Sequence, residues 1–147
     1  MLEPINSFTG EYAFLSNFYP SFIVHEGILY PTVEHAYQAS KTYILEEKLQ
    51  IQGLEKPGQA KRVGRNVTLR DDWEKVKVPI MFSLLKQKFT EHPELQFKLL
   101  ETHPRPLIEG NNWGDTFWGV CNGVGKNVLG DLLETVRFDL TCRVAKN

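Results

Sequence analysis

The chain has 147 residues, a formal net charge of -1 and an apolar fraction of 41%. This length favours one globular domain, 1–147, whose core needs no metal or disulfide, and the small charge argues against broad attraction to nucleic acid or anionic membranes. The sequence shows no signal peptide and no transmembrane run, and Cys121 and Cys142 have no metal or redox spacing. We therefore expect a cytoplasmic protein without a metal ion or cofactor.

The first third of the chain predicts short strands followed by one helix. Aromatic residues and turn formers fill 7–31, and 22–25 with 28–30 suit a hairpin around Glu26 and Gly27. Thr32 is a suitable N-cap, so we expect a helix from residue 33 to about residue 45. A second, short helix is expected over 59–64, after the break at Pro57 and Gly58.

The rest of the chain predicts three more helices. Apolar residues recur at helical spacing from Trp73 to Phe89, but Pro79 leaves two alternatives: a kinked helix, or a main helix that starts near residue 79. Another helix is expected to start at Pro93 and to end before Pro104. We expect a short strand over 107–109, a loop over 111–125, a final helix over 127–138 and a poorly ordered tail after Asp139.

The helix that begins at residue 33 carries an acid, an amide and an amine on one stripe. Glu34, Gln38 and Lys41 follow one another at i, i+4 and i+7. A carboxylic acid and a primary amine held on one face serve acid/base or nucleophilic chemistry. The spacing alone also fits a solvated surface stripe, and this alternative stays open at the level of periodicity.

Three other segments carry chemistry. Ser16 and Asn17 lie among aromatic residues suited to stacking on a flat ring. Lys61 and Arg65 are i, i+4 partners that suit a phosphate, although they equally fit the solvated basic end of a helix. The stretch 115–130 combines an acid, an aromatic pair and glycines before a helix. The amides from Gly123 to Asn127 at this helix start suit an anion such as phosphate, although the stretch matches neither a P-loop nor the dinucleotide fingerprint and also fits a tight turn with a buried tryptophan.

Taken in order, these segments resemble the NADAR family, also called YbiA-like N-glycosidases. The resemblance rests first on GEYAFLSNFYP at 10–20 and YPTVEHAYQA at 30–39. It continues through shorter matches, which include Lys41, Ala60-Lys61, Gly64-Arg65, Asp72-Trp73, Lys88-Phe89, Asp115, Phe117-Trp118-Gly119, Gly123, Gly125, Asn127 and Arg137. Phe22, Cys121 and Glu134 depart from the family pattern, and none of them is an expected catalytic residue. The matches extend over about 8–138, nearly the whole chain.

The resemblance implies a compact α+β fold, mostly helical with a few short strands. It implies an N-glycosidase that cleaves the bond between ribose and a base, most closely in ribosylamino-pyrimidine phosphates of riboflavin biosynthesis. One alternative substrate is ADP-ribose attached to guanine, in which case nucleic acid is a partner only as a modified substrate. A second alternative is a module that binds ADP-ribose or a nucleotide without cleaving it.

Spacing and resemblance together suggest roles for individual residues. Glu34 is expected to act as the acid/base, and Lys41 as a nucleophile that passes through a Schiff base. In a rival mechanism Glu34 activates water and Lys41 only pairs with an anion. Asp115 is expected to hold the ribose hydroxyls or to act as a second carboxylate, in a cleft shared with Glu34. The expected substrate-binding residues are Ser16, Asn17, Phe18, Gln38, Arg65, Trp118, Gly123, Gly125 and Asn127.

Overall fold

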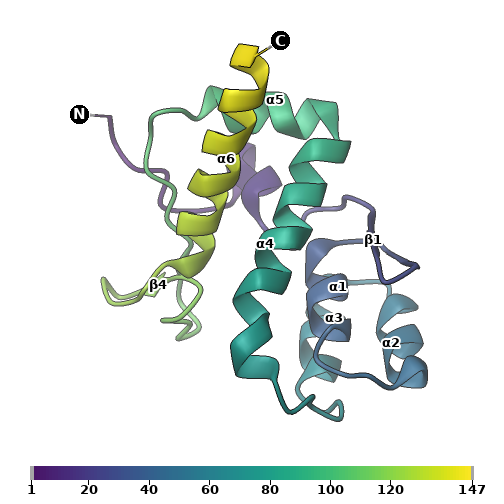
Figure 1. The fold of residues 1–147 in the computed structure, drawn as a ribbon. Helices are drawn as coiled ribbons and strands as arrows, with labels where there is room; N and C mark the ends of the chain where they lie inside the picture. Colours follow the sequence, from purple (N-terminus) through teal and green to yellow (C-terminus); the bar gives the residue numbers. More distant parts are fainter. Residues whose placement is uncertain (1, 147) are drawn as a thin grey trace. The chain divides into compact units, whose positions relative to one another are not determined.

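The computed structural model describes residues 2–146, and Figure 1 shows the order of its elements. In chain order they are the 3-10 helix η1 (Gly10–Leu15), β1 (Ile23–His25), β2 (Ile28–Tyr30), α1 (Val33–Ala39), α2 (Leu45–Gln52), α3 (Pro57–Gly64), α4 (Trp73–Glu91), α5 (Pro93–Glu101), β3 (Gly110–Asn111), β4 (Val120–Cys121) and α6 (Val128–Lys146). The predicted fold class, mostly helical with a few short strands, is confirmed.

The chain forms two compact units. One unit contains Asn17–Lys88, and the other contains the residues up to Ser16 together with those from Phe89 on. α4 begins in the first unit and ends, at Glu91, in the second. The prediction that the chain is one domain therefore stays a prediction.

In the Asn17–Lys88 unit, the short helix α1 is the central element. It packs against α2, α3 and the β1–β2 hairpin, and all seven of its residues are buried. The hairpin is antiparallel, with Ile23 opposite Tyr30 and a turn at Glu26 and Gly27, as the sequence predicts. Because the side chains of Ile23 and Tyr30 are almost fully buried, the hairpin closes one side of the core around α1.

α1 is shorter than the helix predicted over 33–45. It ends at Ala39, where the Ser40 hydroxyl donates to the Ala36 carbonyl at 2.7 Å. The Lys41 carbonyl accepts from the Arg70 amide at 2.8 Å instead of continuing the helix. This hydrogen bond to a distant residue ends the helix without a glycine or proline, so the sequence offers no stop signal.

The following helices differ from the prediction in their bounds. α2 was not predicted, because Leu45 and Leu49 are exposed and its apolar face is narrow. α3 starts at Pro57, which occupies the first helical turn, rather than two residues later. α4 is continuous through Pro79. The alternative in which the main helix starts near residue 79 is therefore wrong, and the alternative of one helix that contains this proline holds.

The second unit is built on α5 and α6, which pack against each other. The strand predicted over 107–109 is wrong by a few residues: Leu107 forms an isolated bridge with Ile5, and the strand β3 lies at Gly110–Asn111, parallel to β4. The tail predicted after Asp139 is also wrong. α6 continues to Lys146, and Leu140, which is 4% exposed, extends its buried face beyond residue 139.

Gly64 at the end of α3 provides a test of how tightly α1 and α3 pack. A Cβ at this position would overlap the Gln38 carboxamide, so Gly64→Ala must displace Gln38. We expect the free energy of unfolding to fall by about 1–3 kcal/mol, the usual cost of overpacking. Urea denaturation measures this change.

Gly58→Ala in the same helix is the matched control. No atom lies within 4 Å of a Cβ built at Gly58, so this variant should be as stable as the wild type or more stable. Equal stability of the two variants would contradict the packing of Gly64 against Gln38.

Candidate active site

The acid and the amide of the predicted stripe are buried. Glu34 is 7% exposed and Gln38 is 4% exposed, and the Gln38 Nε2 donates to Glu34 Oε1 at 3.1 Å. The alternative of a solvated surface stripe is therefore wrong for these two residues. Burying an unpaired carboxylate costs roughly several kcal/mol of folding free energy. A buried acid that is kept beside an amide donor is therefore a candidate catalytic residue.

Thr32 and His35 fix the start of α1 next to Glu34. The Thr32 Oγ1 accepts from the His35 amide at 3.1 Å, as expected for an N-cap. The His35 Nε2 lies 2.9 Å from the Leu54 carbonyl, which only accepts, so this nitrogen carries the proton and Nδ1 accepts from Thr32 at 2.8 Å. Burial lowers the pKa of His35 and favours this neutral form. His35 is thus a structural residue that holds its neighbour in place.

The end of α1 is held by two cations from other elements. The Lys48 Nζ donates to the Ala39 carbonyl at 3.3 Å, and the Arg70 Nη1 donates to the Ser40 carbonyl at 3.4 Å. The Arg70 guanidinium also donates to the Asp72 carboxylate, from Nε to Oδ1 at 2.6 Å and from Nη2 to Oδ2 at 3.0 Å. Positive charge at the carboxyl end of a helix is favourable, so these contacts stabilise the turn that presents Lys41.

Lys41 is half-buried and its amine lies over two aromatic rings. Its Nζ is 5.8 Å from the centre of the Tyr37 ring and 6.0 Å from that of Trp73, and the two rings are 5.2 Å apart. Burial is the main cause that lowers the pKa of Lys41. The nearby Glu34 opposes this effect, whereas the cations of Arg65, Lys61 and Lys77 add to it. A lysine with a lowered pKa is more readily a nucleophile at neutral pH.

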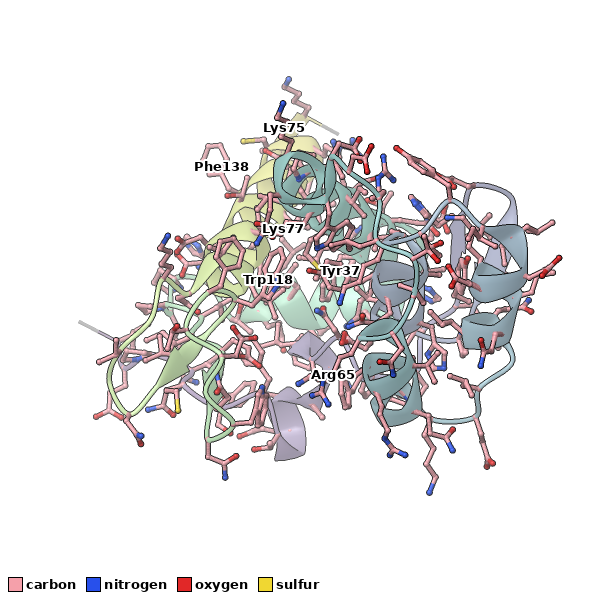
Figure 2. The ribbon with its side chains drawn as sticks, turned by 90° about the horizontal axis from the view of Figure 1, so that it is seen from below. Tyr37, Arg65, Lys75, Lys77, Trp118 and Phe138 are labelled. Atoms are coloured by element: carbon pink, nitrogen blue, oxygen red, sulfur yellow. The ribbon has the colours of Figure 1, made fainter. Side chains whose placement is uncertain are left out.

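Lys41, Lys61, Arg65 and Lys77 form what we call the cationic cluster. Figure 2 labels Tyr37, Arg65 and Lys77, which come from α1, the end of α3 and α4. Lys61 and Arg65 were predicted to bind phosphate, but Lys77 was missed, and so was Trp73 as a contact of the amine. Both lie on one face of α4, four residues apart. The apolar spacing that starts at Trp73 was interpreted as core packing, and Lys77 was not considered.

Asn17 and Phe18 lie at the start of this unit. The Asn17 carbonyl accepts from the Glu34 amide at 3.1 Å, and its Nδ2 contacts the Met81 sulfur at 3.6 Å. Among residues 2–146, the buried Asn17 Oδ1 has no hydrogen-bond partner. Phe18 is 41% exposed, which leaves part of its ring accessible. The structure therefore brings the backbone of Asn17 next to that of Glu34, and binding of substrate by Asn17 stays a prediction.

In the other unit, Asp115 organises the turn that carries Trp118. Its Oδ1 accepts from the amides of Phe117 at 3.1 Å and Trp118 at 2.9 Å. Asn111 holds Asp115 in turn, because its Oδ1 accepts from the Asp115 amide at 3.0 Å. The Trp118 ring packs edge-on against Phe117, with the ring centres 4.9 Å apart. The orientation of the Asp115 carboxylate is thus fixed by backbone donors.

The predicted anion site at the start of α6 is largely wrong. The amides of Lys126, Asn127 and Val128 donate to the carbonyls of Thr116, Gly119 and Phe117, so they are not free for an anion. The Asn127 side chain is also committed: it accepts from the Glu109 amide and donates to the Leu107 carbonyl, both at 2.9 Å. Asn127 is a structural clamp rather than a ligand for phosphate.

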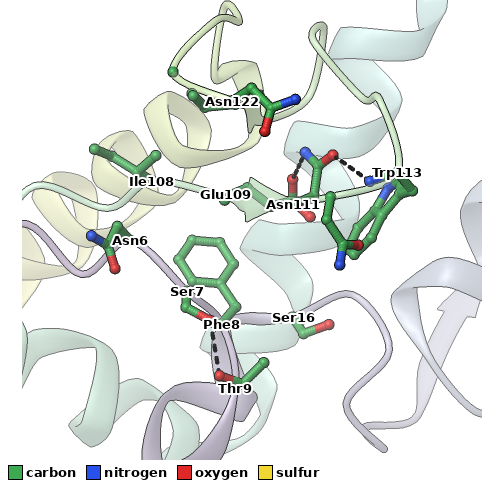
Figure 3. A pocket seen from close by; sticks show the side chains of 14 residues that line it. Asn6, Ser7, Phe8, Thr9, Ser16, Ile108, Glu109, Asn111, Trp113 and Asn122 are labelled. Carbon is green, nitrogen blue, oxygen red and sulfur yellow. Dashed lines mark hydrogen bonds between the residues drawn. The ribbon is translucent and has the colours of Figure 1, made fainter.

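Two glycines of this segment remain candidates for binding. Gly123 lines a pocket together with Ser16, and Gly125 lies two residues further along the chain, with a φ of 155°. Figure 3 shows this pocket, which belongs entirely to the unit that contains α5 and α6.

The predicted site residues fall into two groups. Glu34, Gln38 and Lys41 come together with Asn17 and with the cluster residue Arg65 in the Asn17–Lys88 unit. The other unit holds Ser16, Asp115, Trp118, Gly123, Gly125 and Asn127. The prediction that Glu34 shares a cleft with Asp115 stays a prediction.

Neither a metal site nor a membrane span is found in the part of the chain that the structure describes. Within 2–146, no three His, Cys, Asp or Glu side chains gather closely enough to hold a metal ion. None of the helices over the same residues combines the length and the apolar character that crossing a membrane requires.

Comparison with known proteins identifies the family. The sequence pattern of the NADAR domain matches residues 6–141. The chain belongs to the NADAR family. It is 41% identical to N-glycosidase YbiA of Shigella flexneri over 139 residues, which cover 91% of this chain and 85% of the relative. The NMR structure of the Escherichia coli protein YbiA is similar to the whole chain, with a TM-score of 0.88, 35% identity and 90% of that chain covered.

Of two further relatives, one is named for a pathway and the other for an activity. A riboflavin biosynthesis protein of Vibrio vulnificus is 35% identical over 132 residues, which cover 88% of this chain and 36% of the relative. N-glycosidase Npun_R5314 of Nostoc punctiforme is 36% identical over 135 residues, covering 88% of this chain and 86% of the relative. The predicted family and the predicted class of enzyme, a hydrolase acting on N-glycosyl compounds, are confirmed.

Proposed function

We propose that this N-glycosidase hydrolyses the bond between a base and a phosphorylated ribose, most closely a ribosylamino-pyrimidine phosphate of riboflavin biosynthesis. The observation that carries this proposal is the cationic cluster, which surrounds the half-buried Lys41 in the same unit as the buried Glu34. The names of relatives in Vibrio vulnificus and maize, both riboflavin biosynthesis proteins, support the same pathway.

The cationic cluster fits the phosphate of such a substrate. Arg65, Lys61 and Lys77 each lower the pKa of Lys41 through their charge, so each lies within electrostatic range of its amine. Lys77 also forms an ion pair with Glu74, with Nζ and Oε2 2.6 Å apart. This pair neutralises one cation, and the cluster as a whole keeps an excess of positive charge. A phosphate monoester carries nearly two negative charges at neutral pH and accepts several charge-assisted hydrogen bonds.

Glu34 is the proposed acid that protonates the departing base. It is buried, and Gln38 and the Asn17 carbonyl hold its side chain and its backbone. A buried carboxyl group whose position is fixed is suited to proton transfer, because little reorganisation is needed.

Lys41 is the proposed nucleophile. Its neutral amine attacks the anomeric carbon, the carbon–nitrogen bond to the base breaks, and the base takes the electron pair and a proton from Glu34. The attached nitrogen then returns a proton to Glu34, and its lone pair forms the C=N bond of a protonated Schiff base on Lys41. The ring C–O bond breaks as the sugar opens, and the ring oxygen takes that electron pair and a proton from Glu34. Water hydrolyses the Schiff base and restores the amine. In the rival mechanism Glu34 activates water directly and Lys41 pairs with the phosphate.

Asp115 is proposed to bind the ribose hydroxyls. Its Oδ1 accepts hydrogen bonds from two backbone amides, and no group among residues 2–146 donates a hydrogen bond to its Oδ2. A carboxylate oxygen in this state is an acceptor for a sugar hydroxyl. Phe18 and Trp118 are the proposed stacking residues for the base.

ADP-ribosyl-guanine is a second candidate substrate, and the same cluster favours it because a diphosphate carries similar charge. A direct assay separates the two substrates. The enzyme is incubated with a ribosylamino-pyrimidine phosphate and with ADP-ribosyl-guanosine, and the released base is identified by mass spectrometry. We expect faster release from the pyrimidine. Thermal stabilisation by ligand without any product would indicate a binding module instead.

Glu34→Gln tests the acid. We expect its turnover of the better substrate to fall by about 10²–10⁴, the usual contribution of general acid–base catalysis. Glu46→Gln, at an exposed position in the first turn of α2, is the control and should keep full turnover. Full turnover by Glu34→Gln would rule out this role for Glu34.

Borohydride trapping tests the nucleophile. Reduction during turnover should leave a sugar covalently attached to Lys41, which peptide mass spectrometry locates. Lys41→Arg keeps the charge but should give no adduct and little turnover. The absence of any adduct in the wild type, together with an active Lys41→Arg, would favour direct attack by water.

Arg65→Gln tests the phosphate site. We expect KM for the phosphorylated substrate to rise by about tenfold or more, since hydrogen bonds to charged groups contribute about 1.5–3 kcal/mol. The dephosphorylated nucleoside should be affected much less. Arg62→Gln is the matched control, because Arg62 is exposed on the same helix and does not act on Lys41. Similar KM values for the two variants would contradict the proposed site.

A further inference from the structure

A pocket of about 640 Å³ lies in the unit that contains α5 and α6. Its lining comes from three segments, 6–9, 108–113 and 120–123 without Cys121, together with Ser16. In Figure 3 the Phe8 ring lies at the centre of this lining, between Asn6 on one side and Trp113 on the other. The volume is in the range of small-molecule sites.

The lining is rich in amides and contains no lysine or arginine. Within residues 2–146, the carboxamides of Asn6, Asn112 and Asn122 make no hydrogen bond, so each offers both a donor and an acceptor. Glu109 is the ionisable residue of the lining, and its Oε2 accepts from Asn111 at 3.2 Å. Such a lining suits an uncharged polar ligand and disfavours a phosphate.

Flat apolar surface accompanies the amides. Phe8 is 8% exposed and forms the floor, whereas Trp113 is 58% exposed, a high value for so large an aromatic side chain. Aromatic rings bind other planar rings through their faces. The pocket therefore combines a stacking surface with hydrogen-bonding groups at its edge.

The walls of the pocket are held by backbone contacts before any ligand binds. Gly110 and Asn111 of β3 pair with Val120 and Cys121 of β4. The Asn111 Oδ1 accepts from the amides of Trp113 at 3.3 Å and Asp115 at 3.0 Å, which shapes the loop that carries the tryptophan. A preformed site binds with a smaller cost in ordering.

We propose that this pocket binds an uncharged, planar nitrogen heterocycle that carries amino and carbonyl groups on its edge. A sugar offers hydroxyls to the amides but no flat ring for Phe8 and Trp113, and a phosphate finds no cation in the lining. The inference rests on the proposed function for one point only: the heterocycle is the aminopyrimidine that the reaction releases. This pocket holds the free base, whereas Phe18 and Trp118 are proposed to stack on the base of the substrate.

Binding of the free base tests the proposal independently of catalysis. The probes are a triaminopyrimidinone, guanine and ribose, titrated into the full chain of the Glu34→Gln variant and followed by NMR and calorimetry. We expect the triaminopyrimidinone to bind and to shift the signals of the pocket residues. The proposal would be overturned if this probe did not bind, or if ribose were the only probe that bound to the pocket. Stronger binding of guanine than of the triaminopyrimidinone would assign the pocket to a purine.

Two variants and one control locate the binding site. Asn122→Gly removes a carboxamide at a position whose φ is 51°, which glycine adopts without strain, and Trp113→Ala removes the exposed ring. Each should weaken binding of the base by about tenfold, whereas Gln50→Ala, an exposed amide in α2, should not change it. Equal binding by all three variants would overturn the proposal.

Failure of the proposed function has a different signature. In that case the wild type would release no base from any ribosylated substrate. The free heterocycle would still bind, and Asn122→Gly and Trp113→Ala would still weaken its binding.

Discussion

The hydrogen bonds at the carboxyl end of α1 are the contacts on which the candidate active site depends. Three successive carbonyls, those of Ala39, Ser40 and Lys41, receive donors from Lys48 and Arg70 rather than from a continued helix. These donors end α1 after Ala39 and fix the turn that holds Lys41. Arg70 also binds Asp72, directly before Trp73, so one side chain links the turn to the aromatic residue beneath the amine.

A second constraint concerns charge. The candidate site holds one buried acid and several cations in one unit, and Lys41 experiences both. Desolvation and the neighbouring cations favour its neutral amine, whereas Glu34 favours the charged form. A larger fraction of Lys41 is therefore neutral than for a lysine in water. Nucleophilic attack requires this neutral form of the amine. The amide-lined pocket of the other unit contains no such cations.

Local signals in the sequence predicted the elements that local chemistry determines. Thr32 caps α1 and Pro93 starts α5, and the spacing of Glu34 and Gln38 placed them on one stripe. The end of α1, the helix α2, the contact of Trp73 with the Lys41 amine and the electrostatic effect of Lys77 on it depend on residues distant in the chain. Periodicity cannot reveal these. It also cannot show that the amides before α6 are already occupied by carbonyls from 116–119.

The complete burial of α1 has a consequence for how this protein tolerates change. Surface helices accept many substitutions on their outer face, so variation along them recurs with the helical period. All seven residues of α1 are buried, and no position from Val33 to Ala39 faces solvent. In a saturation mutagenesis experiment these seven positions would form one uninterrupted intolerant block, including those that take no part in chemistry. Intolerance there would reflect packing as much as catalysis.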